Sequence, residues 1–383
     1  MALMKMKEIC TKIGSGATPR GGKEAYIDTG ISLIRSQNVL DLSFSYDGLA
    51  HINEQQADKL SNAVVESGDV LLNITGDSVA RVCVVEDKFL PARVNQHVAI
   101  VRVNKEIVLS SYILYFLQLS KPYLLQLAAG GATRNALTKG MIEELEIEVP
   151  AIEQQRKIVS LINDIQRKIK NNNEINDNLA ETLESVYQQQ FSDCTQDGML
   201  SDICDYSKER IAVSALSLGN YYSTENMMPG KAGAVEASGL PPIAQTTKAN
   251  AGDVLVSNIR PYFKKIAYCQ SECGCSTDVL CFTPKLSSMS AFLFCTLYAD
   301  RFFDFMVAGS KGTKMPRGDK QQIMTYPVHT PSEEELVMFN RLALPILAQI
   351  EQNRAESVRL AALRDALLPK LMSGEIDVAS VQL

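Results

Sequence analysis

The stretch GATRNALTKGMIEELEIEVPAIEQQRKI, which runs from Gly131 to Ile158, contains three patterns in succession. It opens as a glycine-bearing basic loop and continues as an alternation of apolar residues and glutamates from Leu145 to Val149. It then passes Pro150 into a polar segment typical of a helix start. The same succession returns, at an offset of 181 residues, in AGSKGTKMPRGDKQQIMTYPVHTPSEEELVMF, where Pro331 takes the place of Pro150. The order loop, strand, proline, helix is therefore used twice.

Three further segments repeat in the same order, and together they indicate a tandem of two like units. The pairs are GDVLLNIT (Gly68 to Thr75) with GDVLVSNI (Gly252 to Ile259), NQHVAIVRV (Asn95 to Val103) with STDVLCFTP (Ser276 to Pro284), and SSYILYFLQL (Ser110 to Leu119) with SAFLFCTLYA (Ser290 to Ala299). Each unit is expected to contain short β-branched strands bounded by Gly and Asp, one apolar helix and a closing strand.

A long helix is expected after each closing strand, with apolar residues at alternating spacings of four and three that form a coiled-coil seam. The middle of each seam is polar, with Asn172 and Asn176 in the first helix and Asn353 and Ser357 in the second. Polar seam residues reduce stability but fix register, so matching polar centres predict an antiparallel pair whose midpoints meet. Pro345 departs from this plan, and we expect the second helix to be broken or bent there. The residues predicted to pair the helices are Ile162, Ile165, Ile169, Asn172, Asn176, Leu179, Leu183, Ile346, Ile350, Asn353, Leu360 and Leu367.

Composition limits the classes of protein to be considered. The chain has 383 residues, 46% of them hydrophobic, which suffices for two or more domains with cores of their own. No apolar run approaches the roughly 20 residues of a membrane span, and nine cysteines without a secretory feature favour reduced thiols. We therefore expect a soluble, cytoplasmic protein with no membrane partner. The net charge of -6 argues mildly against nucleic-acid binding, but much of the deficit lies in the expected long helices.

Catalytic and metal-binding patterns are not found in the sequence. Its three histidines form no HExxH motif, and the glycines of GSGATPRGGK (Gly14 to Lys23) lack the spacing of a dinucleotide or phosphate loop. Four clustered cysteines, Cys269, Cys273, Cys275 and Cys281, are spaced as in a strand rather than as in a zinc site. We therefore predict no catalytic residue, no metal and no cofactor.

Polar loops in both units offer hydrogen-bond donors instead. Arg, Lys, Asn and Gln side chains carry forked or paired donors that match base edges and phosphates. For any single residue, exposure to water is the simpler explanation, but a whole set on a duplicated scaffold favours recognition of DNA. The predicted DNA-binding residues are Thr18, Arg20, Arg35, Gln37, Asn38, Thr75, Arg81, Arg93, Asn95, Arg134, Asn135, Ser257, Asn258, Arg260, Tyr262, Lys264, Lys314 and Arg317.

The chain resembles the specificity subunits of type I restriction-modification systems. The resemblance rests on two GDVL-bearing units, on the helix starts PAIEQQRKI and PSEEELVMF, and on the terminal LLPKLMSGEIDV, from Leu367 to Val378. It implies two target-recognition domains that each read one half of a split site in double-stranded DNA, and two conserved helices that set their separation and dock methylation subunits. The implied partners are adenine-methylating subunits, two of them, and restriction subunits, so the specificity subunit itself is not catalytic. Base-reading residues in such subunits vary with the sequence read, so no individual contact carries over.

The expected fold class is α+β, with two tandem α/β target-recognition domains separated by two long antiparallel coiled-coil helices in a pseudo-two-fold arrangement. The expected segments are 1–150, the first recognition domain; 151–191, the central long helix; 192–330, the second recognition domain; and 331–383, the C-terminal helix and tail.

Two other functions remain open. A coiled-coil scaffold that binds only protein would show no DNA binding even with partner subunits present. A stand-alone DNA methyltransferase needs a methyl-donor loop and an Asn/Asp-Pro-Pro-aromatic motif. NIRPYF, Asn258 to Phe263, does not match that motif, because Ile259 and Arg260 occupy the wrong places.

Overall fold

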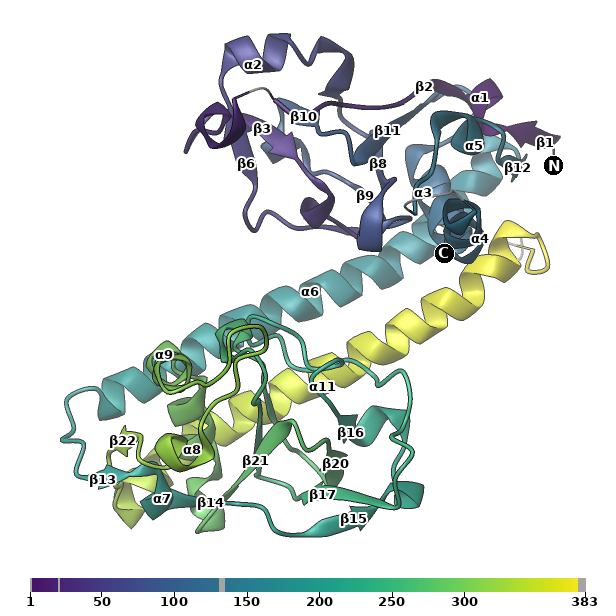
Figure 1. The fold of residues 1–383 in the computed structure, drawn as a ribbon. Helices are drawn as coiled ribbons and strands as arrows, with labels where there is room; N and C mark the ends of the chain where they lie inside the picture. The colour runs from purple at the N-terminus through teal and green to yellow at the C-terminus, as the bar shows by residue number, and fades with distance from the viewer. Residues whose placement is uncertain (1, 20, 131–134, 378–383) are drawn as a thin grey trace. The chain divides into compact units, whose positions relative to one another are not determined.

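The computed structural model describes residues 2–19, 21–130 and 135–377. The chain divides into two compact units, unit 1 (Met1–Lys168 with Arg359–Leu383) and unit 2 (Ile169–Val358). The helices α6 (Ile152–Phe191) and α11 (Glu333–Met372) each begin in one unit and end in the other (Figure 1). This division differs from the predicted segments, which set the two long helices apart from the recognition domains. None of the described helices is long and apolar enough to cross a membrane.

Unit 1 is built on two four-stranded sheets. Its elements, besides parts of the two long helices, are β1 (Ala2–Lys5), α1 (Met6–Ile9), β2 (Cys10–Ser15), η1 (Gly22–Ala25), β3 (Ile31–Ile34), η2 (Ser36–Asn38), β4 (Val39–Leu40), β5 (Ser43–Phe44), β6 (Ala50–Ile52), α2 (Glu54–Asp58), η3 (Ser61–Ala63), β7 (Val64–Val65), β8 (Val70–Asn73), η4 (Gly76–Ser78), β9 (Val82–Val84), η5 (Asp87–Phe89), β10 (Ala92–Val94), β11 (Val98–Val103), α3 (Ser110–Leu119), α4 (Lys121–Ala129), α5 (Lys139–Glu143) and β12 (Glu146–Val149). One sheet has the order β2-β11-β8-β9 with all neighbours antiparallel, and the other has the order β6-β3-β10-β7 with β3 and β10 parallel. The closing strand β12 pairs antiparallel with β1.

Unit 2 repeats this plan. Its elements, besides parts of the long helices, are β13 (Gly198–Met199), α7 (Leu200–Ile203), β14 (Cys204–Tyr206), β15 (Arg210–Ala212), η6 (Val213–Ala215), η7 (Leu218–Asn220), β16 (Tyr221–Tyr222), β17 (Gln245–Ala249), β18 (Val254–Ser257), η8 (Pro261–Phe263), β19 (Ile266–Tyr268), β20 (Cys273–Cys275), β21 (Val279–Pro284), η9 (Ser287–Met289), α8 (Ser290–Tyr298), α9 (Asp300–Ala308), α10 (Lys320–Ile323) and β22 (Pro327–Val328). The order β14-β21-β18-β19 matches β2-β11-β8-β9, and the parallel pair β16 and β20 matches β3 and β10. The edge strand β15 departs from the repeat, because it joins the sheet beside β17 whereas β6 joins beside β3.

The GDV turns show why the repeated segments of the two units adopt the same local structure. Gly68 and Gly252 have φ angles of 85° and 90°, a conformation that residues with a side chain rarely adopt. The aspartate that follows each glycine accepts a hydrogen bond at 2.8 Å from the backbone N–H three residues before it. The buried strands β8 and β18 begin directly after these two turns.

Each unit closes its core with one end of each long helix. In unit 1, Ile158 and Ile162 of α6 and Leu368 and Leu371 of α11 pack with the β2-β11-β8-β9 sheet and α3 in one apolar cluster. In unit 2 the cluster contains Leu183, Tyr187 and Phe191 of α6 and Leu336, Phe339, Ala343 and Leu347 of α11, together with α8. The helices are therefore part of the folded units and not only links between them.

The predicted break at Pro345 is wrong, because α11 runs as one helix from Glu333 to Met372. Proline removes the N–H that would bond the carbonyl of Arg341 and its ring crowds that carbonyl. Both Pro345 and Arg341 are exposed, so water satisfies the freed carbonyl and the helix continues.

Candidate nucleic-acid interface

Three loops of unit 1 meet at one end of the β2-β11-β8-β9 sheet. They are the loop after β8, the turn before β11 and the segment before α5. The N–H of Ile74 donates to the carbonyl of His97 at 3.0 Å, and the N–H of Leu137 donates to the carbonyl of Ile74 at 2.8 Å. Thr75 and Ala136 form a β-bridge. Backbone hydrogen bonds thus hold the three loops in one frame.

A hollow of about 420 Å³ lies beside these loops. Its walls include three of the predicted DNA-binding residues, Gln37, Thr75 and Arg81, together with Ser36, Gly76, Asp77, Ser78 and His97. Arg81 is half-buried, and Gln37 is exposed. Donors from separate loops therefore line one concave surface.

His97, which was not among the predicted residues, is the centre of a polar cluster at this hollow. Its Nδ1 lies 2.5 Å from Thr75 Oγ1, and its Nε2 lies 3.0 Å from Gln96 Nε2. Gln96 in turn accepts a hydrogen bond from Thr18, and Asn95 Oδ1 accepts one from the His97 N–H at 3.0 Å. Gln96 and His97 lie in the repeated segment that begins at Asn95. Their place in a repeated segment is the feature of the sequence that could have identified them as site residues.

The prediction for Asn38 is corrected by its burial. Its side chain is fully buried, and its amide nitrogen donates to the carbonyls of Ser45 and Asp47 at 2.9 and 3.3 Å. Its Oδ1 accepts from the Arg35 N–H at 3.0 Å. Asn95 is also buried and uses its oxygen in the bond to His97 described above. Asn38 therefore shapes its loop with both ends of its amide, and Asn95 holds the turn at His97 through its oxygen.

The other unit 1 predictions lie in varied surroundings. Arg35 donates to the carbonyl of Gly48 at 2.6 Å, and the Arg93 Nε donates to the carbonyl of Ala57 at 3.2 Å, so both half-buried guanidinium groups hold neighbouring loops. Asn135 is exposed, and its carbonyl accepts from the Gly76 N–H. Arg20 and Arg134 lie outside the described residues.

Unit 2 brings the corresponding loops together in the same way. The N–H of Asn258 donates to the carbonyl of Asp278 at 2.8 Å, and the N–H of Arg260 donates to the carbonyl of Pro316 at 2.8 Å. Ile259 and Arg317 form a β-bridge. The loop after β18, the turn before β21 and the segment before α10 therefore make a second frame with the connections of the first.

Arg317 combines an exposed side chain with an ion-pair partner. Its Nη2 lies 3.1 Å from Asp278 Oδ1, with 54% of the arginine side chain exposed. Ser257 and Asn258 are buried, which corrects the prediction that they are exposed to DNA; Ser257 Oγ donates to the carbonyl of Ile259, and Asn258 Oδ1 has no hydrogen-bond partner among the described residues.

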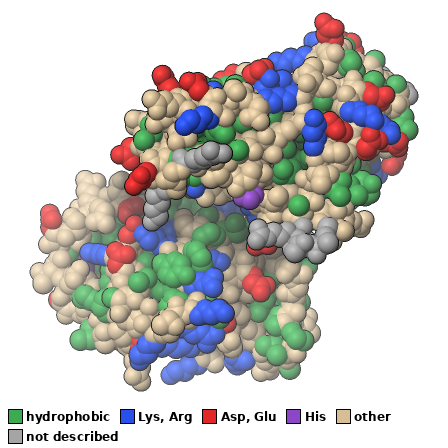
Figure 2. All heavy atoms as spheres, turned by 45° about the horizontal axis from the view of Figure 1, so that its top comes forward, with side chains coloured by type: hydrophobic (Ala, Val, Ile, Leu, Met, Phe, Trp, Pro, Cys, Tyr) green, Lys and Arg blue, Asp and Glu red, His purple; other side chains and the backbone are tan. Residues whose placement is uncertain are grey.

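The remaining unit 2 predictions lie at the surface or near it. Arg260 is half-buried in a left-handed conformation, with φ 50°. Lys264 lies 2.9 Å from Asp300, whose pKa is held below its usual value first by the hydrogen bond with Lys231 and then by that with Lys264. Tyr262 and Lys314 are exposed. Figure 2 shows Lys and Arg side chains along the lower rim of unit 2 in that view, with few Asp or Glu among them.

The polar residues predicted at the helix centres lie together in unit 2. Asn353 Nδ2 donates to Asn176 Oδ1 at 2.8 Å, and Asn176 Nδ2 donates to the carbonyl of Ile350 at 3.2 Å. Asn172 Nδ2 donates to Glu356 at 2.8 Å. Within unit 2 the partner of Gln190 is the carbonyl of Glu335, so residue numbers rise along α6 as they fall along α11 and the helices are antiparallel there.

The apolar residues predicted for helix pairing are buried or half-buried. Those buried are Ile162, Ile165, Leu183 and Ile350, and those half-buried are Ile169, Leu179, Ile346, Leu360 and Leu367. In unit 1 the side chain of Arg364, at a seam position, donates to Gln166 at 2.9 Å.

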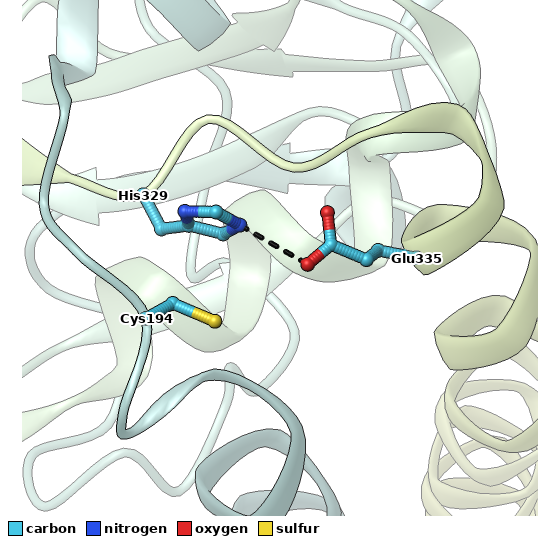
Figure 3. A group of neighbouring side chains, drawn as sticks. All are labelled: Cys194, His329 and Glu335. Carbon is cyan, nitrogen blue, oxygen red and sulfur yellow. Dashed lines mark hydrogen bonds and ion pairs between the residues drawn. The ribbon is translucent and has the colours of Figure 1, made fainter.

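Two groups of side chains of metal-ligating types lie in unit 2. Cys269, Cys273, Cys275 and Cys281 lie in one buried cluster of unit 2, and burial raises the pKa of the Cys275 thiol to about 12. A second group, with ligand atoms within 4.8 Å of one another, joins Cys194, His329 and Glu335 (Figure 3).

The second group lies at the N-terminal end of α11. The Glu335 carboxylate accepts hydrogen bonds from the N–H and Oγ of Ser332, both at 2.7 Å, which is a capping box. These bonds hold the pKa of Glu335 below its usual value. His329 Nδ1 lies 3.2 Å from the carbonyl of Thr195, and Cys194 Sγ donates to the carbonyl of Gln190.

Part of the chain matches a known protein family. Residues 1–181 match the family described as the type I restriction modification DNA specificity domain. No curated protein sequence matches the chain. The structure of the S subunit of a type I restriction-modification system from M. genitalium aligns over 97% of this chain and 96% of its own, with 13% identity and a TM-score of 0.58. At that identity the likeness shows the fold alone.

Two further structures align over nearly the whole chain. The HsdS subunit from Thermoanaerobacter tengcongensis has 16% identity, coverage of 98% and 97%, and a TM-score of 0.39. A chain from a structure concerned with complex assembly and conformational transition of the type I R-M system has 15% identity, coverage of 98% of each chain, and a TM-score of 0.42. Scores of this size do not inform the fold. The match of residues 1–181 to the type I restriction modification DNA specificity domain agrees with the resemblance found in the sequence.

Proposed function

We propose that the chain is the DNA-recognition subunit of a type I restriction-modification complex, in which unit 1 reads one half of a bipartite site in double-stranded DNA and unit 2 reads the other. The observation that carries this proposal is the doubled loop frame. In each unit the loop after β8 or β18, the turn before β11 or β21 and the segment before α5 or α10 are joined by the same backbone bonds. A repeated frame with different side chains suits two readers of different sequence.

In this proposal the long helices set the spacing between the two readers and dock methylation subunits. Each helix of 40 residues is about 60 Å long at 1.5 Å per residue. The hydrogen-bonded pair Asn176 and Asn353 fixes the register of one helix against the other, because a shift along the seam leaves both amides buried without partners.

The chain supplies recognition and its partners supply the chemistry. Methyl transfer to adenine belongs to the methylation subunits, of which we propose two because the chain has two like units, and cleavage belongs to restriction subunits where the system has them. The complex acts in the cytoplasm, where the DNA lies.

The test is to co-express the chain with the methylation subunit encoded beside it and to map methylated adenines across the host genome. We expect one motif made of two short sequences at a fixed separation. Cells that express the chain alone, or the methylation subunit alone, are the controls and should show no such motif. A single continuous motif, or modification that does not need the chain, would contradict the proposal.

A further inference from the structure

The two loop frames match position by position, which allows their side chains to be compared. The N–H of Ile74 bonds the carbonyl of His97 in unit 1, and the N–H of Asn258 bonds that of Asp278 in unit 2. The β-bridge from Thr75 to Ala136 in unit 1 recurs in unit 2 from Ile259 to Arg317. His97 therefore corresponds to Asp278, and Ala136 to Arg317.

The side chains at the matched positions differ in kind. In unit 1, His97 of the turn before β11 contacts the loop after β8, where its Nδ1 lies 2.5 Å from Thr75 Oγ1. In unit 2, Asp278 of the turn before β21 contacts the segment before α10 instead, where its Oδ1 lies 3.1 Å from Arg317 Nη2. The residues opposite are apolar in each case, Ala136 in unit 1 and Ile259 in unit 2. The same frame thus presents an imidazole with a hydroxyl in one unit and a guanidinium with a carboxylate in the other.

We propose that these pairs are what makes the two half-sites different: Arg317, positioned by Asp278, reads a guanine for unit 2, and His97 with Thr75 reads a base of the other half-site for unit 1. This inference rests on the proposed function. It names the specificity-determining residues of each unit and the base that one of them recognises.

Arg317 has the features of a base reader. A guanidinium presents five N–H donors in a fixed fork and matches the O6 and N7 acceptors of guanine. The contact with Asp278 engages Nη2, and more than half of the side chain remains exposed. The backbone of Arg317 is held on both sides, since its N–H donates to the Lys311 carbonyl at 3.0 Å and its carbonyl accepts from the Lys311 N–H at 2.9 Å. Asp278 is a positioning residue, because its carboxylate holds the guanidinium through Nη2 while most of the side chain stays exposed.

The experiment uses the full chain co-expressed with its methylation subunit, and it measures methylation of DNA substrates that carry every base at each position of both half-sites. Arg317→Ala should lower the preference for guanine at one position of one half-site roughly five- to hundredfold and leave the other half-site unchanged. Arg317→Lys keeps the charge but loses the fork, so it should lose most of the same preference. His97→Ala should change only the opposite half-site.

The Asp278→Asn variant tests whether Asp278 acts by positioning Arg317 and not by contacting DNA itself. It should weaken the guanine preference in the wild-type chain and have no further effect in the Arg317→Ala chain. Lys285→Ala is the matched control, because it removes one exposed positive charge beyond the far end of β21. Thermal unfolding of each variant shows whether it is folded, and Arg317→Gln replaces the alanine variant if that one is not.

The outcomes separate this inference from the proposed function. If the wild-type complex methylates a bipartite site and Arg317→Ala reduces modification of all sequences equally, Arg317 is a phosphate contact and the inference is wrong. If Arg317→Ala and His97→Ala change the same half-site, it is also wrong. If the wild-type complex modifies no bipartite site, it is the proposed function that fails.

Discussion

The hydrogen bond between Asn176 and Asn353 allows a quantitative test of helix pairing. Asn353 donates to Asn176 at 2.8 Å and accepts from Gln349 at 2.8 Å, and both asparagines are buried. In Asn353→Leu the oxygen of Asn176, a residue that is only 9% exposed, loses its donor. An unsatisfied buried polar group costs about 1 to 3 kcal/mol, and for a unit of this size each kcal/mol lowers the unfolding temperature by about 2 to 4 °C. Asn176→Leu should have a similar effect, because it leaves the Asn353 amide without its acceptor.

The double variant with both leucines should be less destabilised than the sum of the two single variants. Leucine has the same number of side-chain heavy atoms and the same branch point as asparagine, and the pair of leucines leaves neither of the two amides without a partner. We expect a coupling free energy of about 1 to 3 kcal/mol. The assay is urea unfolding followed by circular dichroism, with hydrogen exchange of peptides from residues 169–191 to confirm that unit 2 is the part affected. Asn171→Leu, an exposed neighbour, is the control and should change stability by less than about 0.5 kcal/mol. Additive effects of the two substitutions would refute the argument, since they would show that the asparagines do not depend on each other.

Further predictions follow from the same structure. Replacing Asn172 by Leu together with the Asn176 and Asn353 pair should raise thermal stability and permit other registers or oligomers, which size-exclusion chromatography with light scattering detects; lower stability in a monodisperse sample would contradict it. Inserting one heptad into each helix near Asn172 and Asn353 adds about 10 Å of length at 1.5 Å per residue, or roughly three base pairs at about 3.4 Å each, and turns the far half-site by roughly 100°. We therefore expect a longer spacer with weaker modification, or none, and full activity on the original spacer would show that helix length does not set the spacing. Arg260→Ala should alter only the half-site read by unit 2, as judged by methylation of substrates varied in each half; an effect on both halves would rule out independent readers. Burial raises the pKa of Asp253 in the folded protein, so the charged carboxylate destabilises the fold above that pKa. The free energy of unfolding therefore increases as the pH falls through the raised pKa toward the usual value. Asp253→Asn should accordingly raise stability to urea at pH 7, and this gain should shrink in acid; a constant difference at all pH values would exclude titration of Asp253 as the cause.

Repeats and periodicity in the sequence were enough to find the elements and their order. The apolar helix predicted from Ser110 to Leu119 is α3 with the same bounds, and its repeat is α8. The GDV words mark two turns that need a glycine, and the alternation after Leu145 marks β12. These features are local, because the period of apolar residues follows directly from which face of a strand or helix is buried. The polar seam positions likewise identify asparagines that lie together in unit 2.

The sequence did not determine which loop residues face outward. Asn38 and Gln37 are adjacent polar residues in one loop, yet Asn38 is fully buried among backbone carbonyls and Gln37 is exposed at the hollow. Amide and guanidinium groups satisfy a backbone carbonyl as readily as a base edge, so composition alone does not separate the two roles. His97 and Asp278 gain their partners only when loops distant in sequence are brought together by the sheet. Which side chains lie at each loop frame is therefore decided by the tertiary structure, while the existence of two like units was already evident from the repeat in the sequence.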